Sequence, residues 1–143
     1  MHISFRIPGK LRGKGRPRFV RKSGHVYTDA KTVAHEGIVR SYAYEAMAGR
    51  APLEGPVRLS IAMRINHTAS WSKSRKAAAV YVTGKPDADN VCKLIGDGAN
   101  GILWKDDSQI SQIDFDRRYQ NGPEYVDISV YDLNAAPFTK AAA

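Results

Sequence analysis

The sequence predicts an α+β fold, a single small domain in which a mixed β-sheet is flanked by two helices. Residues 2–8 and 57–65 alternate apolar and polar side chains, as strands with one buried face do. Residues 30–48 and 89–100 instead carry apolar side chains at helical spacing. The chain has 143 residues, which is the length of one domain with a modest core.

A hairpin is expected between the first strand and the first helix. Two short apolar pairs, at 19–20 and 26–27, follow a basic loop rich in Gly and Pro. Ser23 and Gly24 lie between them and are suited to a tight turn.

The first helix has clear boundaries in the sequence. Thr28 or Asp29 is a suitable N-cap for residues 30–48. Gly49 ends the helix. The stretch at 57–65, which follows two prolines, is the clearest strand in the chain because all of its apolar side chains fall on one face.

The second half of the chain adds a basic segment, a helix and two strands. Residues 71–79 have weak helical propensity and are expected at the surface. Strands at 109–119 and 125–131 are expected to form a hairpin through 120–123. The helix at 89–100 divides cleanly into a polar and an apolar face. Its apolar face carries Val91, Leu94, Ile95 and Gly98.

The composition is that of an ordinary globular chain, with 43% hydrophobic and 25% charged residues. No apolar run approaches the roughly 20 residues that cross a bilayer, and the N-terminus lacks the apolar core of a signal peptide. A single cysteine, Cys92, excludes an intrachain disulfide and a cysteine-rich zinc site. These features predict a cytoplasmic protein without a membrane partner. We place the domain at 1–133 and expect the Ala-rich tail at 134–143 to fray.

Positive charge is concentrated near the N-terminus. The net charge is +8, and residues 1–28 hold eight Lys or Arg residues and no Asp or Glu. This bias favours a polyanion such as nucleic acid as partner, although a solvated arm that aids solubility would look similar. A second basic stretch lies at 71–79. The residues expected to contact nucleic acid are Arg12, Lys14, Arg16, Arg18, Arg21, Lys22, His25, Lys73, Arg75 and Lys76.

Two carboxylates form an acidic site at the start of the second helix. Asp87 and Asp89 are two residues apart, just after Pro86, so in an extended backbone both would point the same way. Carboxylate oxygens are the ligands that Mg²⁺ prefers. Taken singly, Asp89 could be only an N-cap and Asp87 only a turn residue.

Lys93 lies on the same helix face as Asp89, four residues later. It could form an i,i+4 pair with Asp89, which would contribute a few tenths of a kcal/mol. It could equally meet the negative charge of a phosphate. Spacing alone does not separate these two interpretations.

A second acidic pair, Asp106 and Asp107, follows the apolar run that ends at Trp104. If that run packs in the core, the acidic turn is held at one edge of the site. Adjacent residues in an extended segment point in opposite directions, so only one of the two is expected to bind metal. An isolated acidic turn at the surface is the ordinary alternative.

These residues resemble the RusA family of Holliday junction resolvases, especially its phage and prophage branch. The segments at 13–19, 25–28 and 70–73 also resemble that branch, so the likeness covers most of the chain. The family pattern D-x-D-N-x-x-K, followed after a helix by a D-D pair, is met by Asp87, Asp89, Asn90, Lys93, Asp106 and Asp107.

The resemblance implies a homodimer that cuts two opposed strands of a four-way DNA junction with Mg²⁺, for which Mn²⁺ can substitute. Asp87, Asp89 and Asp107 would then be the catalytic metal ligands, and Lys93 the essential cation. Metal-activated water would hydrolyse the phosphodiester. Candidates to support the metal ligands are Asn90, Asp97 and Asp106.

The chain departs from the family pattern at Gly96 and Gly98, where apolar or small helix-forming residues would be expected. Each glycine weakens a helix by up to about 1 kcal/mol relative to Ala. Gly98 lies on the apolar face and could permit close packing against another helix. Two other functions remain: a non-catalytic protein that binds DNA junctions, and a Mg²⁺-dependent nucleotide phosphohydrolase. The phosphohydrolase would gain little from the basic N-terminal segment.

Overall fold

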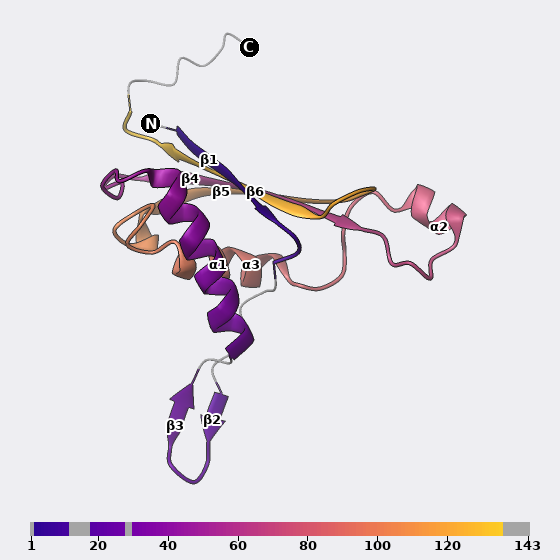
Figure 1. The fold of residues 1–143 in the computed structure, drawn as a ribbon, viewed down its shortest axis with the longest axis horizontal. Coiled ribbons are helices and arrows are strands. Elements are labelled where there is room, and N and C mark those ends of the chain that lie inside the picture. The colour runs from indigo at the N-terminus through magenta and orange to yellow at the C-terminus, as the bar shows by residue number, and fades with distance from the viewer. Residues whose placement is uncertain (1, 12–17, 28–29, 136–143) are drawn as a thin grey trace.

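The computed structural model describes residues 2–11, 18–27 and 30–135, without the side chains of residues 18–20 and 27. These residues form a four-stranded sheet, three α-helices and a separate two-stranded hairpin (Figure 1). Among the described residues, no helix is long and apolar enough to cross a membrane.

The sheet is mixed, as predicted. Its strands are β1 (His2–Pro8), β4 (Val57–Asn66), β5 (Ile110–Gln120) and β6 (Tyr125–Asp132), in the order β1-β6-β4-β5. β4 and β5 run parallel, and the other neighbouring strands are antiparallel. Every second residue of β4 from 57 to 65 is buried, so the strand predicted at 57–65 and its buried face are confirmed.

The predicted hairpin between the last two strands is wrong. β5 and β6 do not pair with each other, because β4 lies between them: Ser60 of β4 is opposite Asp114 of β5 and Ser129 of β6. The turn residues at 120–123 therefore connect strands on either side of β4 rather than neighbours. The physical reason is that β4 has the most continuous apolar face, and a central position buries that face while pairing both of its edges.

Both long helices pack on the same face of the sheet. These are α1 (Ala30–Met47) and α3 (Ala88–Gly98), which lie together below the strands in Figure 1. The two helices expected to flank the sheet are therefore both on one face. In the described part of the chain, no helix covers the other face. The N-cap of α1, expected at Thr28 or Asp29, lies outside the described residues. Gly49 follows α1 with φ +79°, as expected for a helix terminator.

The two helices touch because Gly98 has no side chain. A Cβ atom at Gly98 would lie 2.9 Å from the Cβ of Val39 and 3.0 Å from the backbone oxygen of Glu36, both on α1. The close packing expected at Gly98 is therefore directed at the chain's own first helix. Its contribution is to hold α3, and the acidic residues at its start, in a fixed position on the sheet.

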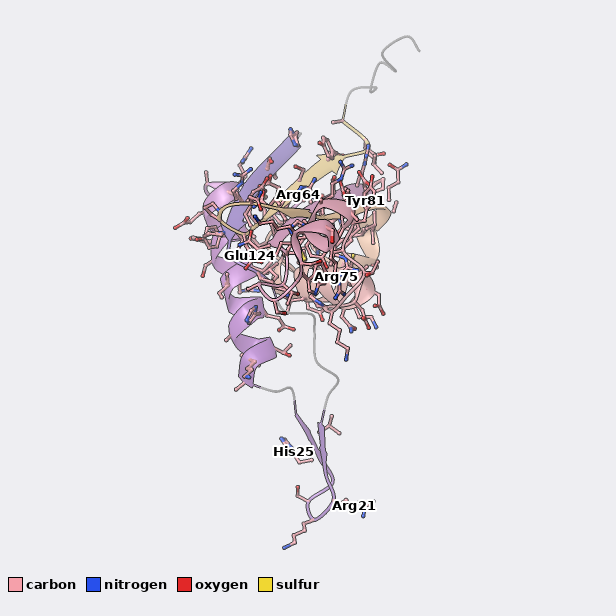
Figure 2. All side chains as sticks on the ribbon, turned by 90° about the vertical axis from the view of Figure 1, so that its right-hand side faces the viewer. Arg21, His25, Arg64, Arg75, Tyr81 and Glu124 are labelled. Atoms are coloured by element: carbon pink, nitrogen blue, oxygen red, sulfur yellow. The ribbon has the colours of Figure 1, made fainter. Side chains whose placement is uncertain are left out.

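Two smaller elements stand away from this core. The hairpin of β2 (Arg18–Val20) and β3 (His25–Tyr27) extends beyond the start of α1, and Gly24 makes its turn with φ +66° (Figures 1 and 2). The basic segment expected at the surface forms a short helix, α2 (Lys73–Ala78), at the far end of the sheet. The expected tail falls largely on residues 136–143, which lie outside the described part of the chain.

Candidate active site

The loop that leads to Asp87 is tied to strand β5. Arg117 donates through Nη1 to the backbone oxygen of Gly84 at 2.9 Å and to that of Pro86. The backbone N–H of Val82 donates to the oxygen of Arg117 at 3.2 Å. Arg117 thus anchors the residues just before Asp87. Nothing in the local sequence predicts this role, because Arg117 lies in a strand more than thirty residues away.

Asp87 occupies the N-cap position of α3, but its side chain makes no capping hydrogen bond. Asp89 lies in the first turn of the helix rather than at its cap. The alternative prediction, that Asp89 is only the N-cap of the helix, is therefore wrong. Both carboxylates are exposed, and Asn90 beside them is half-buried.

The division of α3 into two faces is confirmed. Val91, Leu94, Ile95 and Gly98 are buried, whereas Asp89 and Lys93 are exposed. In the described part of the chain, no ion pair joins Asp89 to Lys93. The structure therefore does not form the i,i+4 pair, and the ammonium group of Lys93 faces solvent on the same side of the helix as the Asp89 carboxylate.

Cys92, which is half-buried, lies on α3 close enough to Asp89 to feel its charge. Burial raises the pKa of the Cys92 thiol, and the negative charge of Asp89 raises it further. The thiol is thus held in its neutral form close to the acidic residues.

The acidic turn at the other end of the site is firmly held. Leu103 and Trp104 are fully buried, so the apolar run before the turn packs in the core as expected. Gln109 donates through Nε2 to the backbone oxygens of Leu53 at 2.8 Å and Gly55 at 2.9 Å. Nothing in the local sequence predicts this role of Gln109, because its partners are more than fifty residues away.

Asp106 caps the short 3-10 helix η1 (Asp107–Gln109). Its carboxylate accepts from the N–H of Ser108 at 3.2 Å, and its own N–H donates to Oε1 of Gln109 at 2.9 Å. The N–H of Ser108 is the largest cause that lowers the pKa of Asp106. Asp106 therefore shapes the turn that presents its neighbour, Asp107.

Asp107 lies against α3. Its N–H donates to Oδ1 of Asn100 at 3.1 Å, and its side chain packs beside Gly96. The pKa of Asp107 is raised, first by the hydrogen bond it shares with Asp106, then by partial burial and by the charges of Asp106 and Asp97. Asp97 is half-buried and contributes to the site through this charge.

The carboxylates share one side of α3 but are spread along it. Asp89 and Gly96, where Asp107 packs, are seven residues apart, which is about 10 Å along a helix. Within the described residues, no three His, Cys, Asp or Glu side chains are placed to hold one metal ion. The oxygen donors match Mg²⁺ in type, and Asp87, Asp89 and Asp107 are all exposed.

The residues predicted to contact DNA fall into three groups. Arg12, Lys14 and Arg16, and the side chain of Arg18, lie outside the described part of the structure. Arg21, Lys22 and His25 are exposed on the β2–β3 hairpin, which points away from the core (Figure 2). The members on α2 are Lys73, Arg75 and Lys76.

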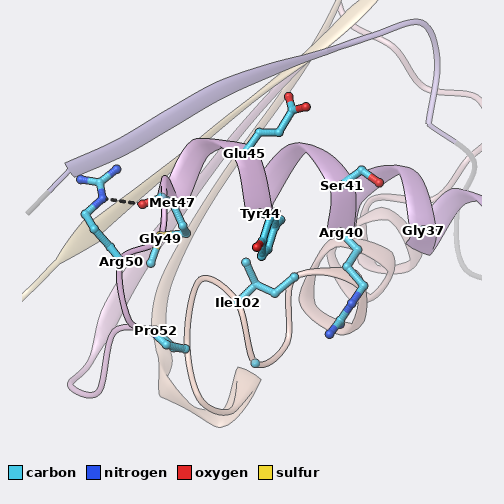
Figure 3. Close-up of a pocket in the computed structure, with 11 residues that line it drawn as sticks. Gly37, Arg40, Ser41, Tyr44, Glu45, Met47, Gly49, Arg50, Pro52 and Ile102 are labelled. Carbon is cyan, nitrogen blue, oxygen red and sulfur yellow. Dashed lines mark hydrogen bonds between the residues drawn. The ribbon is translucent and has the colours of Figure 1, made fainter.

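A large groove lies elsewhere on the surface. It has a volume of about 970 Å³ and runs along α1, between that helix and the loops at 49–52 and 101–102 (Figure 3). Tyr44 and Ile102 line its middle, and Arg50 closes one end by donating to the backbone oxygen of Met47 at 2.8 Å. None of the predicted catalytic residues lines it. The candidate site is thus an exposed surface rather than an enclosed pocket.

Comparison with known proteins agrees with the residue pattern. A model of the family described as endodeoxyribonuclease RusA matches residues 8–131. The chain is also 27% identical over 142 residues to the uncharacterized protein YqaN of Bacillus subtilis (strain 168), and this match covers 93% of the chain and 98% of YqaN.

Proposed function

Because the chain belongs to the RusA family of endodeoxyribonucleases, we propose that it is a metal-dependent nuclease that resolves four-way DNA junctions by paired cuts, in recombination or repair. One observation carries this proposal. α3 exposes Asp89 and Lys93 on the side against which the turn with Asp107 packs. Carboxylates can hold a metal ion that activates water, and a lysine on the same face can stabilise charge on the phosphate.

The roles of the side chains follow from their positions. Asp87, Asp89 and Asp107 would hold Mg²⁺ or Mn²⁺, which supplies an activated water and stabilises charge on the phosphate. Lys93, exposed and unpaired with Asp89, would approach a non-bridging phosphate oxygen. Arg117 and Gln109 hold the two segments that present the carboxylates.

Two cuts on opposed strands need two active sites, so the proposed active form is a homodimer. The size of the protein in solution, measured by light scattering at working concentration, tests this part. A particle of two chains is expected. A strict monomer under conditions of paired cleavage would contradict it.

The activity is tested by Mg²⁺-dependent cleavage of a synthetic four-way junction beside a linear duplex of matching sequence. Symmetric nicks in the junction alone are expected. Asp89→Asn should lose cleavage but keep or tighten junction binding, since it removes a metal ligand and a charge that repels DNA. Glu45→Gln, which removes an exposed carboxylate on α1, is the matched control and should cut normally. Equal cutting of both substrates would indicate a general nuclease.

A non-catalytic protein that binds junctions is the second candidate. The observation that favours it is the spacing of Asp89 and Asp107 along α3, which leaves the carboxylates of the described chain apart. Tight junction binding without cleavage under Mg²⁺ or Mn²⁺ would support this function instead.

A further inference from the structure

A basic platform stands at the far end of the sheet. We use this name for Lys73, Arg75 and Lys76 on α2. Residues 67–86, which surround the platform, contain four Lys or Arg residues and no Asp or Glu. In Figure 1, α2 lies near one end of the long axis of the molecule, well beyond α3, and Figure 2 views it end-on with Arg75 labelled.

Aromatic contacts fix the platform to strand β5. The ring of His67 stacks on Tyr119 with a centroid distance of 4.7 Å, and Trp71 meets Tyr119 edge-on at 5.4 Å. Nε2 of His67 lies 2.9 Å from the backbone oxygen of Ala79, which ties together the two ends of the segment. A charged segment held in this way loses little conformational entropy when it binds a partner.

Within the described part of the chain, the basic groups of the platform face no carboxylate, unlike the arginines on the open face of the sheet. On that face, the arginines pair with aspartates. The pairs are Arg6 with Asp127, Arg58 with Asp114, and Arg64 and Arg118 with Asp116. Among the described residues, no carboxylate lies within ion-pair distance of Lys73, Arg75 or Lys76. The platform therefore keeps its charge available for an external anion.

Arg75 is oriented for such an interaction. Its guanidinium group lies over the Trp71 ring, 4.0 Å from the centroid. Stacking occupies the flat face of the guanidinium and leaves the N–H groups at its edge free to donate. Trp71 thus fixes the side chain without consuming its hydrogen-bond donors.

We propose that the basic platform binds the phosphate backbone of a duplex DNA arm, away from the crossover and the cut. This inference rests on the proposed function, because it assumes that the carboxylates of α3 face the scissile phosphate. α2 stands beyond α3, so a duplex arm leaving α3 in that direction would pass it. Duplex DNA offers regularly spaced phosphates, whose condensed counterions are released when basic side chains neutralise them. This suits a cluster of basic side chains that faces no carboxylate among the described residues.

The test uses the full chain with Asp89→Asn, so that binding is measured without cleavage. Lys73→Gln and Lys76→Gln are combined in this background, and affinity is measured over a salt series for junctions with long and with short arms. On long arms, the slope of log K against log[salt] should fall by about 0.9 for each phosphate that the variant no longer neutralises. Binding to arms too short to reach α2 should not change.

A matched control removes two other positive charges. Arg6→Gln and Arg58→Gln each take away a cation that already faces a carboxylate, Asp127 and Asp114 respectively. The salt slope of this control should equal that of the parent. A slope that falls equally in both double variants would assign the effect to net charge and overturn the inference.

Three further outcomes show whether the inference fails alone or together with the proposed function. If the platform variant binds long-armed junctions with unchanged affinity and slope while the wild-type chain cuts them, the platform has no DNA role and the nuclease stands. If affinity falls equally on short and long arms, the platform lies at the crossover and the arm assignment is wrong. If the parent binds no junction at all, the proposed function fails together with the inference.

Discussion

Asp107 lies against Gly96: a Cβ atom at Gly96 would be 3.7 Å from both the Cβ and Oδ2 of Asp107. The glycine that departs from the family pattern is therefore the point at which the acidic turn meets α3. A side chain longer than a methyl group at position 96 would fill the space in which the Asp107 carboxylate rests, on the same side of the helix as Asp89 and Lys93.

This proximity predicts a size limit at position 96. A Cβ at 3.7 Å is at ordinary van der Waals distance, so Gly96→Ala should cut junctions at the parental rate. Gly96→Leu should displace Asp107 and lower cleavage by about 10²-fold, the effect of an ångström-scale misplacement. Single-turnover cleavage measures the loss, and circular dichroism with junction binding checks that the fold remains. Full activity in Gly96→Leu would show that Asp107 is not part of the active site.

Gly98 and Gly37 are predicted to respond in opposite ways to alanine. At Gly98 the new methyl would meet Val39 and the backbone of Glu36 at about 3 Å, so Gly98→Ala should lower the free energy of unfolding by about 1–2 kcal/mol. At Gly37 on α1, nothing lies within 4 Å, so Gly37→Ala should raise it by up to about 1 kcal/mol through helix propensity. Urea unfolding measures both. A change of the same sign in the free energy of unfolding at both positions would contradict the close packing of α1 and α3.

Arg117 is predicted to act as a positioning residue. Arg117→Leu removes the donors that hold the oxygens of Gly84 and Pro86, so the loop before Asp87 should loosen. Cleavage should fall by up to about 10²-fold while junction affinity stays near the parental value. Arg117→Lys, which keeps one positively charged donor nitrogen, should recover part of the rate. An equal loss of affinity and rate would instead mean that Arg117 binds DNA directly.

The thiol of Cys92 is predicted to report on Asp89. Burial and the Asp89 charge both raise its pKa, so little thiolate is present near neutral pH and alkylation by iodoacetamide should be slow. Asp89→Asn removes the negative charge. The thiol pKa should then fall toward its usual value, and alkylation at a given pH should be faster. Urea-unfolded samples of the two proteins are the control and should react alike. Identical pH profiles in the folded state would contradict the proximity of the two side chains.

Local features of the sequence predicted most of the elements correctly. The alternation at 57–65 identified the buried face of β4, and the helical spacing after Asp89 identified the apolar side of α3. Ser23 and Gly24 marked the turn between β2 and β3. These signals depend on residues a few positions apart, and their periodicity follows directly from strand and helix geometry.

Interactions between distant segments were not predictable in this way. The pattern at 109–131 indicated a hairpin, but β4 pairs with both strands and separates them, because its apolar face is buried best at the centre of the sheet. Arg117 and Gln109 act on backbone oxygens more than thirty and more than fifty residues away. No local spacing carries information about such partners.

The candidate site depends on both kinds of information. The order of residues after Pro86 determined that Asp89 and Lys93 share one exposed helix face, since four residues make about one helical turn. Only the tertiary structure decided that Asp107 lies beside Gly96, that Asp106 is a cap and that α2 stands at the far end of the sheet. Side chains one turn apart are brought together by the helix itself, whereas residues from different elements meet only where packing of the core places them.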